Sequence, residues 1–360
     1  MMKRITFCAL LMTLFLLLSC GSGSAKVEDP KTIFLTSIAN LGKGFLDVFT
    51  SLSDMVSGAF GIKAETKKSD IGKYFSDIET TMISVKNKLN TVMAENSNYP
   101  KVKEVVAQFI TGTLDKIAAG AKKAASGATD GVSIGEVVKS DSAGNGPDAD
   151  SVKNLVVGIK EIVDLVIKEG DGQADKTIPV DDDKKNIGKL FGAETAADKG
   201  AEDKHVAAAS ASIGAVTGAD ILKAIAAANA DATKGGKVKE VKDAAGLALA
   251  KGTGTADDDK LGDSAKKDAI IAAGIALRAM AKGGKFIVKD TGANKTEAES
   301  AKGVAASAIG KTLSTLIIAI RNTVDTGLKT ISDALATVTQ EDKSVEVTTP
   351  ADATASGQKQ

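Results

Sequence analysis

Apolar side chains recur at alternating steps of four and three residues along both ends of this chain. In residues 31–60 the apolar positions are Phe34, Ile38, Leu41, Phe45, Val48, Leu52, Met55 and Ala59. Residues 71–92 and residues 299–338 keep nearly the same spacing. A heptad-like period places the apolar side chains on one stripe of a helix, which must then be buried against another helix. The two ends of the chain therefore predict long amphipathic helices packed in a bundle.

Turn signals divide the N-terminal pattern into three helices. Ser69 or Asp70 can cap the second helix, the stretch at 96–100 (NSNYP) stops it, and Pro100 suits the first turn of a third helix that extends to residue 117. Short turns between helices place them antiparallel. The helix at 299–338 is the natural packing partner of these three.

The middle of the chain lacks the long heptad-like apolar spacing of its ends. Residues 120–150 predict a loop with one short helix, and Ala-rich helix material and one clear helix follow later, at 204–250 and 264–282. A compact apolar helix at 151–166 and two polar loops, at 170–186 and 252–263, separate these segments. The best strand candidate, Phe286-Ile287-Val288, has three residues. We predict an all-α fold: an elongated helical bundle with membrane-proximal N- and C-terminal helices and a distal cap of short helices and long loops.

The Ala-rich part contains a weak internal sequence similarity. Residues 244–249 (AAGLAL) resemble residues 272–277 (AAGIAL), and Lys-Gly-Gly-Lys occurs at 234–237 and again at 282–285. Both Gly pairs fall where a helix should end, and glycine closes helices there in the left-handed conformation. Two readings stay open: similar helix ends in a biased sequence, or duplicated helical units.

The N-terminus reads as a bacterial lipoprotein signal. Lys3-Arg4 precedes a short apolar run at 5–18, and Leu17-Leu18-Ser19-Cys20 fits a lipobox apart from the large Leu18. We expect residues 1–19 to be a signal peptide and Cys20 to be lipidated; the alternative is an ordinary signal peptide with an incidental cysteine. Residues 20–30 are expected to form a flexible tether, residues 31–340 a single all-helical domain whose central part at 120–260 is variable and distal, and residues 341–360 a disordered tail.

Composition excludes several classes of function. Removing the signal peptide takes away Lys3 and Arg4 from a chain of formal charge +0, so the remainder stays close to neutral, unlike a nucleic-acid-binding protein. Cys8 leaves with the signal, so Cys20 can form no intramolecular disulfide. The chain has one histidine, His205, and 3% aromatic residues, which is poor material for a metal cage or an aromatic-walled pocket.

No motif predicts catalysis or a cofactor. Gly310-Lys311-Thr312 resembles the end of a P-loop, but the glycine that the motif needs five residues earlier is Ala305. The acidic runs at 181–183 and 257–259 do not match a calcium loop. Asn294-Lys295-Thr296 is a glycosylation sequon by letters only, and His205 is expected at the surface. We predict no enzyme, no catalytic or metal-binding residues and no cofactor.

Residues 265–289 (AKKDAIIAAGIALRAMAKGGKFIVK) strongly resemble the invariant region of the variable large proteins of relapsing-fever Borrelia and of the related variable surface lipoprotein of Lyme spirochaetes. The leader (KRITFCALLMTLFLLLSC), the helix at 31–60 and residues 100–124 are also similar to that family. The resemblance implies a lipid-anchored antigen on the outer membrane, expressed one variant at a time, with host antibodies as its partners. It also implies that residues 265–289 are mostly buried.

Two further interpretations remain beside the antigen. The first is an envelope lipoprotein that acts as an adhesin or ligand-binding module, which a contiguous apolar patch or groove on the distal surface would favour. An enzyme is a distant third. The sequence does not decide between a monomer and a homodimer. If the antigen reading holds, exchanging loop 170–186 for unrelated polar residues should leave the melting temperature nearly unchanged.

Overall fold

The computed structural model describes residues 62–95, 99–139, 146–177, 182–193, 198–232, 236–252, 260–292 and 296–337, and single positions between 29 and 39. The predicted signal peptide, Cys20, nearly all of the tether and of the helix at 31–60, and the tail at 341–360 lie outside the described residues.

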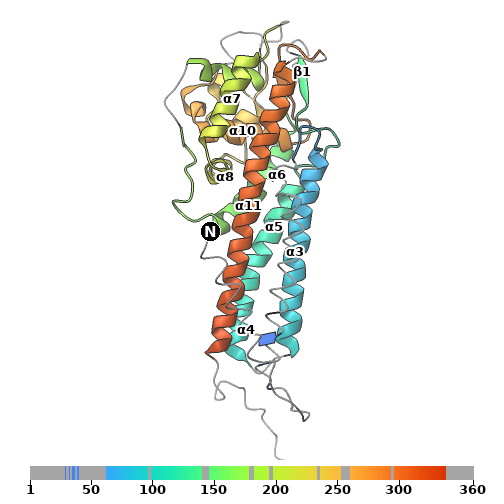
Figure 1. The fold of residues 1–360 in the computed structure, drawn as a ribbon, viewed down its shortest axis with the longest axis vertical. Coiled ribbons are helices and arrows are strands. Elements are labelled where there is room, and N and C mark those ends of the chain that lie inside the picture. The colour runs from blue at the N-terminus through green and yellow to red at the C-terminus, as the bar shows by residue number, and fades with distance from the viewer. Residues whose placement is uncertain are drawn as a thin grey trace, which may run out of the picture.

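Long helices form an elongated stalk (Figure 1). Its elements are α3 (Lys68–Glu95), α4 (Pro100–Phe109), a π-helical turn (Ile110–Leu114), α5 (Asp115–Ala125), α6 (Ala149–Val166) and α11 (Thr296–Ala336). The π turn makes α4 and α5 one continuous helical segment, which returns antiparallel beside α3. The long helices predicted from the apolar spacing at 71–92, 100–117 and 299–338 are confirmed.

The apolar seams are buried as the spacing predicts. Ile78, Met82 and Leu89 on α3 are fully buried, and so are Ile309, Ile320 and Ile331 on α11. The α3 and α11 helices run in the same direction along the stalk, and the Tyr74 hydroxyl donates a hydrogen bond to the carbonyl oxygen of Leu313 at 3.1 Å. A helix early in the chain is thus fixed to the last helix.

The α11 helix is long and apolar enough to resemble a membrane span. Its most apolar 18-residue window has a mean hydropathy of 1.6, yet 61% of that window is buried inside the protein. Among the described residues, α7 (Asp203–Ala215) and α8 (Gly218–Ala226) pass the same test only as a pair bent by 98°. The apolar surface of α11 is therefore used in the core of the protein.

Short helices form a broader cap beside the upper half of α11 (Figure 1). They are α7 (Asp203–Ala215), α8 (Gly218–Ala226), α9 (Ala244–Leu249) and α10 (Asp268–Met280), with 3₁₀ turns at Asp182–Leu190, Val238–Glu240 and Asp263–Lys266. The predicted helix material at 204–250 is thus three separate helices, and the helix predicted at 264–282 begins as a 3₁₀ turn. Stalk and cap share one continuous apolar core.

Two three-residue strands close the top of the molecule. Strand β1 (Val137–Lys139) pairs in parallel with β2 (Phe286–Val288), and Val138 lies opposite Ile287. The segment at 286–288 was the best strand candidate in the sequence; β1 was not anticipated, because residues 120–150 read as loop and helix. The helices dominate, and the all-α prediction is confirmed.

Candidate functional site

The α10 helix occupies the centre of the cap. Twelve of its 13 residues are buried, among them Ile271, Ile275, Leu277 and Met280, while Ile270 is half-buried. It packs against α6, α7, α8, α9 and α11. This confirms that the segment resembling an invariant family region is mostly buried, and it places that segment where neighbouring helices constrain every turn.

Arg278 is a buried cation on this central helix. Its side chain is 1% exposed, and Nη1 donates to the carbonyl oxygens of Ala248 at 2.9 Å and Ala250 at 2.6 Å. Its Nε donates to the carbonyl of Lys285 at 2.6 Å, and the guanidinium carbon lies 5.8 Å from the ring centre of Phe191. Burial lowers the pKa of Arg278 to about 9. Backbone carbonyls, rather than a carboxylate, hold this charge.

Lys68, the first residue of α3, brings a second cation to the end of the same helix. It is 0% exposed, and its Nζ donates to the carbonyl of Ala279 at 2.5 Å. Burial lowers the pKa of Lys68 to about 7, an effect that the nearby Asp130 carboxylate opposes and that Arg278 adds to. This contact joins the start of the stalk to the centre of the cap.

A third buried charge ties the loop at 170–186 to α10. Lys184 Nζ lies 2.5 Å from the Asp268 carboxylate, with side chains 9% and 1% exposed. The Ala269 N–H also donates to the carbonyl of Lys176. The expectation that 170–186 is wholly interchangeable is therefore wrong for Lys184, because removing one partner of a buried ion pair leaves the other charge uncompensated. Residues 168–171 are exposed.

His205 is buried, which corrects the prediction of a surface residue. It is 2% exposed at the start of α7, where its Nδ1 accepts a hydrogen bond from the backbone N–H of Glu202 at 3.0 Å. The Glu202 side chain completes a reciprocal capping box. The signal in the sequence was the spacing of three from Glu202, a polar helix cap, to His205. The histidine closes the terminus of α7 through its contact with Glu202.

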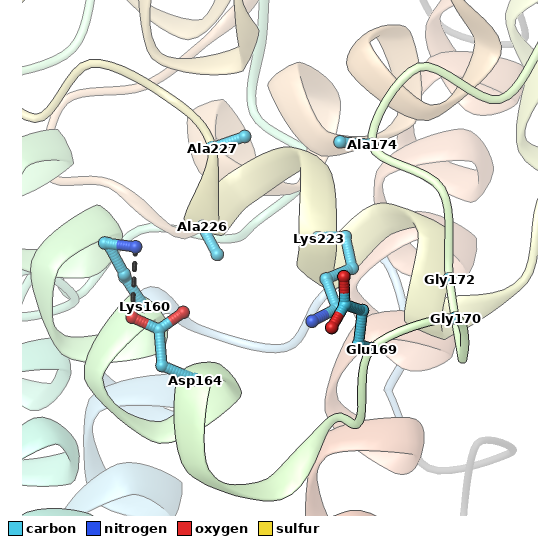
Figure 2. A pocket seen from close by; sticks show the side chains of 9 residues that line it. All are labelled: Lys160, Asp164, Glu169, Gly170, Gly172, Ala174, Lys223, Ala226 and Ala227. Carbon is cyan, nitrogen blue, oxygen red and sulfur yellow. Dashed lines mark ion pairs between the residues drawn. The ribbon is translucent and has the colours of Figure 1, made fainter.

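An open groove of about 340 Å³ lies between the end of α6 and α8 (Figure 2). Its lining residues are Lys160, Asp164, Glu169, Gly170, Gly172, Ala174, Lys223, Ala226 and Ala227. Lys160 pairs with Asp164 at 3.0 Å, and Lys223 Nζ donates to the carbonyl of Ile167. These side chains satisfy the protein's own groups, so the groove carries no arrangement of nucleophile, base and oxyanion donors.

The other motifs from the sequence form no site among the described residues. Gly310-Lys311-Thr312 lies inside α11, where the Thr312 hydroxyl donates to the carbonyl of Ala308. Within the described ranges no three His, Cys, Asp or Glu side chains gather as metal ligands. The acidic run at 257–259, Asp181 and Asn294 fall outside those ranges.

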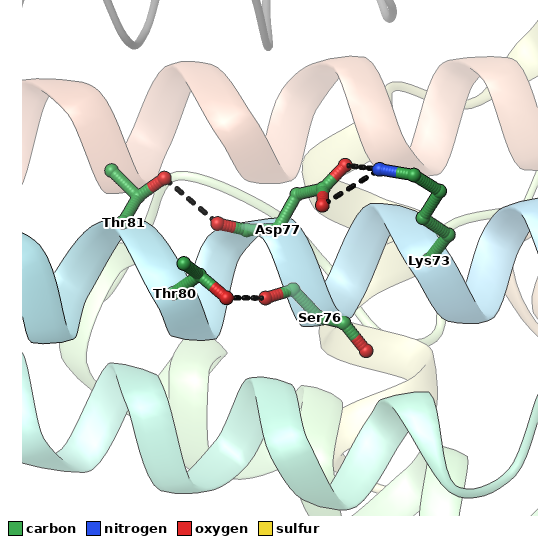
Figure 3. A network of polar contacts seen from close by, with 5 residues as sticks. All are labelled: Lys73, Ser76, Asp77, Thr80 and Thr81. Carbon is green, nitrogen blue, oxygen red and sulfur yellow. Dashed lines mark hydrogen bonds and ion pairs between the residues drawn. The ribbon is translucent and has the colours of Figure 1, made fainter.

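Polar groups on α3 bond to one another along their own helix (Figure 3). Lys73 Nζ lies 2.6 Å from the Asp77 carboxylate, and the Thr80 and Thr81 hydroxyls donate to the carbonyls of Ser76 and Asp77. Lys73 and Thr80 are exposed, whereas Thr81 is buried and its hydroxyl is satisfied by the backbone of its own helix.

Asp29 locates the N-terminal segment relative to the base of the stalk. Tyr99 begins the turn into α4 at that end, and its pKa is raised by burial and by the charge of Asp29. Cys20, the predicted lipidation site, lies outside the described residues, nine positions before Asp29.

Comparison with known proteins gives consistent matches over most of the chain. A family model described as "Borrelia lipoprotein" matches residues 45–335. Variable large protein 4 of Borrelia hermsii is 56% identical, covering 99% of this chain and 100% of that protein. Variable large protein 17 of the same species is 59% identical, with 99% of each covered. The crystal structure of the Lyme disease variable surface antigen VlsE of Borrelia burgdorferi matches with a TM-score of 0.68 and 36% identity, covering 83% of this chain and 97% of that one.

Proposed function

Because the chain belongs to the Borrelia lipoprotein family, we propose that it is a lipid-anchored antigen of the outer surface. It is one of a set of alternately expressed variants, and changing the variant evades host antibody. The resemblance noted in the sequence is confirmed by the family match and by the likeness to VlsE. The protein presents a surface, and the described residues assemble no catalytic arrangement.

The separation of buried and exposed residues in the cap is the observation that carries this function. Almost all of α10 is buried, whereas residues 168–171 and most of 175–177 face solvent. Substitution of exposed residues changes stability by less than about 0.5 kcal/mol, whereas substitution in a packed core costs several times more. Antibodies read the exposed residues, so the antigen can change while the fold is kept.

The anchor is proposed to be lipid on Cys20, which would turn the base of the stalk toward the membrane. Nine residues span at most about 32 Å when fully extended. The proximity of Asp29 to Tyr99 therefore supports an anchor close to the base of the stalk and a cap at the far end. One acyl chain alone binds a membrane only marginally, so we expect Cys20 to carry more than one.

Protease digestion of intact cells tests the surface location. We expect the cap loops to be cut in intact cells, as judged by blotting for this chain, while a periplasmic protein is protected until the cells are lysed. Protection of this chain until lysis would overturn the proposal. In a companion experiment, Cys20→Ala should leave the protein in the soluble fraction; a Cys20→Ala protein that still partitions with membranes would exclude this anchor.

The adhesin alternative gains no support from the described surface. The exposed large apolar side chains there are Leu35, Ile83 and Ile318, and the latter two lie on the stalk helices α3 and α11. The groove of Figure 2 is open, and its lysines already contact other groups of the protein: Lys160 pairs with Asp164, and Lys223 donates to the carbonyl of Ile167.

A further inference from the structure

Four helices of the protein end in the same unusual way. At the C-termini of α6, α7, α9 and α10 the next residue is extended, at Ile167, Val216, Ala250 and Ala281. The last carbonyls of a helix have no partner within it, so a chain that leaves in an extended direction exposes them. Glycine in the left-handed conformation is a common solution. None of these four positions is a glycine, and Gly283, with φ +73, lies beyond the end of α10.

The other described C-termini handle these carbonyls locally. The α5 and α8 helices continue in right-handed helical conformation at the cap residue, and α4 runs on into the π turn. After α8, for example, the N–H groups of Ala227 and Ala228 donate to the carbonyls of Lys223 and Ile225. Continuation of the turn supplies backbone donors, so these ends need no donor from elsewhere.

A cation from a different element closes the α6 and α7 ends. Lys223 on α8 donates from Nζ to the carbonyl of Ile167 at 3.1 Å, as Figure 2 places it beside the end of α6. Lys311 on α11 donates from Nζ to the carbonyls of Ile213 at 2.8 Å and Val216 at 2.7 Å. A positive charge at a helix C-terminus also interacts favourably with the helix dipole.

The remaining two ends follow the same rule. Arg278 on α10 donates to the carbonyls of Ala248 and Ala250 at the end of α9, and Lys68 on α3 donates to the carbonyl of Ala279 at the end of α10. Each of these four helices therefore receives a cation from another element, in addition to the backbone bonds that the Ile167, Ala250 and Ala281 N–H groups donate at three of the ends.

We propose that two of these cations, Lys223 at the end of α6 and Arg278 at the end of α9, are positioning residues that free the cap loops from closing the helices they follow, while Lys68 and Lys311 close helix ends that no long loop follows. We call all four the end-closing cations. A helix end whose last carbonyl is satisfied from the scaffold does not need the next residues to supply a donor for it. The inference rests on the proposed function, since it identifies the residues that let exposed segments vary without loss of fold. Two long polar loops start at such ends: the one after α6 and the one after α9.

The loop after α6 offers the cleanest test. A loop variant replaces Lys168 and Glu169 with Ser and keeps Gly170, whose φ is +89, and Asp171, whose carboxylate accepts a hydrogen bond from the Lys168 N–H at 3.2 Å. It is combined with Lys223→Met in the purified full-length lipoprotein in detergent. With Lys223 present we expect the loop variant to change the Tm by less than about 1 °C. In the Lys223→Met background we expect the same loop change to lower the Tm by about 2–4 °C more.

Amide hydrogen exchange gives the local readout. The Ile167 N–H donates to the carbonyl of Val163 in the last turn of α6. With Lys223→Met we expect the loop variant to accelerate exchange there by about tenfold, and with Lys223 present to leave it unchanged. Lys223→Arg keeps a donor and should restore independence from the loop. Lys160→Met removes a lysine from the same groove that pairs within its own helix, and should create no dependence.

Equal effects of the loop variant with and without Lys223 would overturn the proposal, because a merely stabilising lysine gives additive changes. Should Lys223→Met fail to fold, Arg278→Lys combined with a Gly/Ser replacement of residues 253–259 asks the same question at the end of α9. The inference is supported if the loop replacement accelerates amide exchange at Ala248–Ala250 in the Arg278→Lys protein and leaves it unchanged when Arg278 is present. It is contradicted if the loop replacement has no effect on exchange in the Arg278→Lys protein. Neither result depends on where the protein lies in the cell.

Discussion

The stalk and the cap bury their helices by different means. In the stalk, large side chains such as Phe75, Met82 and Leu89 fill the space between long helices at regular intervals. In the cap, short helices pack through small residues: Gly274 of α10 lies against the side chain of Leu247 on α9, so closely that a Cβ there would meet it at 2.9 Å. Charges on the described stalk lie mostly at its surface, as at Lys73, with Lys68 at the start of α3 as a buried exception, whereas the cap buries charges such as Arg278.

This difference shows which interactions fix the helix packing in each region. A seam of large apolar side chains is robust to changes of surface residues but sensitive to cavities. The cap buries several charged or polar side chains, among them Arg278, Asp268 and His205, so its helix directions also depend on polar contacts. The two regions should therefore respond differently to the same kinds of mutation.

The largest expected effect comes from Arg278→Met. It leaves the carbonyls of Ala248, Ala250 and Lys285 without their donor inside the cap. We expect the free energy of unfolding to fall by about 4 kcal/mol, since each buried unsatisfied group costs about 1–3 kcal/mol. Denaturant unfolding measures the loss. Hydrogen exchange should accelerate first in α9 and α10; acceleration that begins in α3 would contradict a cap-specific role.

Leu89→Ala tests the stalk in the same way. Leu89 is fully buried on α3, so truncation leaves a cavity and should lower the free energy of unfolding by about 3 kcal/mol. Exchange should accelerate in the lower stalk and stay slow in α10. Uniform acceleration across both regions would show that they unfold as one unit. Lys88→Ala, at the neighbouring exposed position, is the control.

The pH dependence of stability should report on the contact between the two regions at Lys68. Its pKa in the folded protein is about 7, against 10.5 when unfolded. Between these values the unfolded chain binds more protons, so stability rises as the pH rises from about 7 toward 10.5. We expect a gain on the order of 2 kcal/mol between pH 7 and 9. Below pH 7 this contribution is flat.

Chemical denaturation at several pH values measures that gain. Asp130, Glu136, Lys285 and Arg278 also act on the Lys68 amine, so Lys68→Met is the necessary comparison. The Lys68→Met protein should lose most of the rise. An unchanged pH profile in Lys68→Met would assign the dependence to other groups.

Lys73→Ala should have the smallest effect. Its ion pair with Asp77 is exposed along one helix face (Figure 3), with side chains 68% and 32% exposed. Exposed pairs of this kind contribute less than about 0.5 kcal/mol. A Tm change above about 2 °C would mean that this face of the stalk is coupled to the core.

The sequence predicted the stalk more fully than the cap. Heptad-like spacing fixes which face of a helix is buried, so α3, α5 and α11 could be anticipated from residues such as Ile78 and Leu316. The burial of α10 was anticipated through its family resemblance. Strand β1 was missed because three residues carry too little pattern, and its pairing with β2 joins segments far apart in the chain.

The buried charges lie beyond what periodicity can show. His205 was assigned to the surface because it opens an Ala-rich helix, and the loop that holds Lys184 was read only as polar. Their burial depends on tertiary partners: the backbone of Glu202 for His205 and the carboxylate of Asp268 for Lys184. No local pattern separates a lysine that reaches water from one that reaches a distant carbonyl or carboxylate.

The position of α11 has a kinetic consequence. This last helix completes the stalk, and its contact with Tyr74 joins residues 239 positions apart. Contacts of such long sequence separation require closure of large loops and slow folding. During synthesis and export the earlier helices cannot complete their core until α11 has emerged. A chain that loses α11 should therefore remain an expanded intermediate, with α3 and α5 helical but exchanging rapidly.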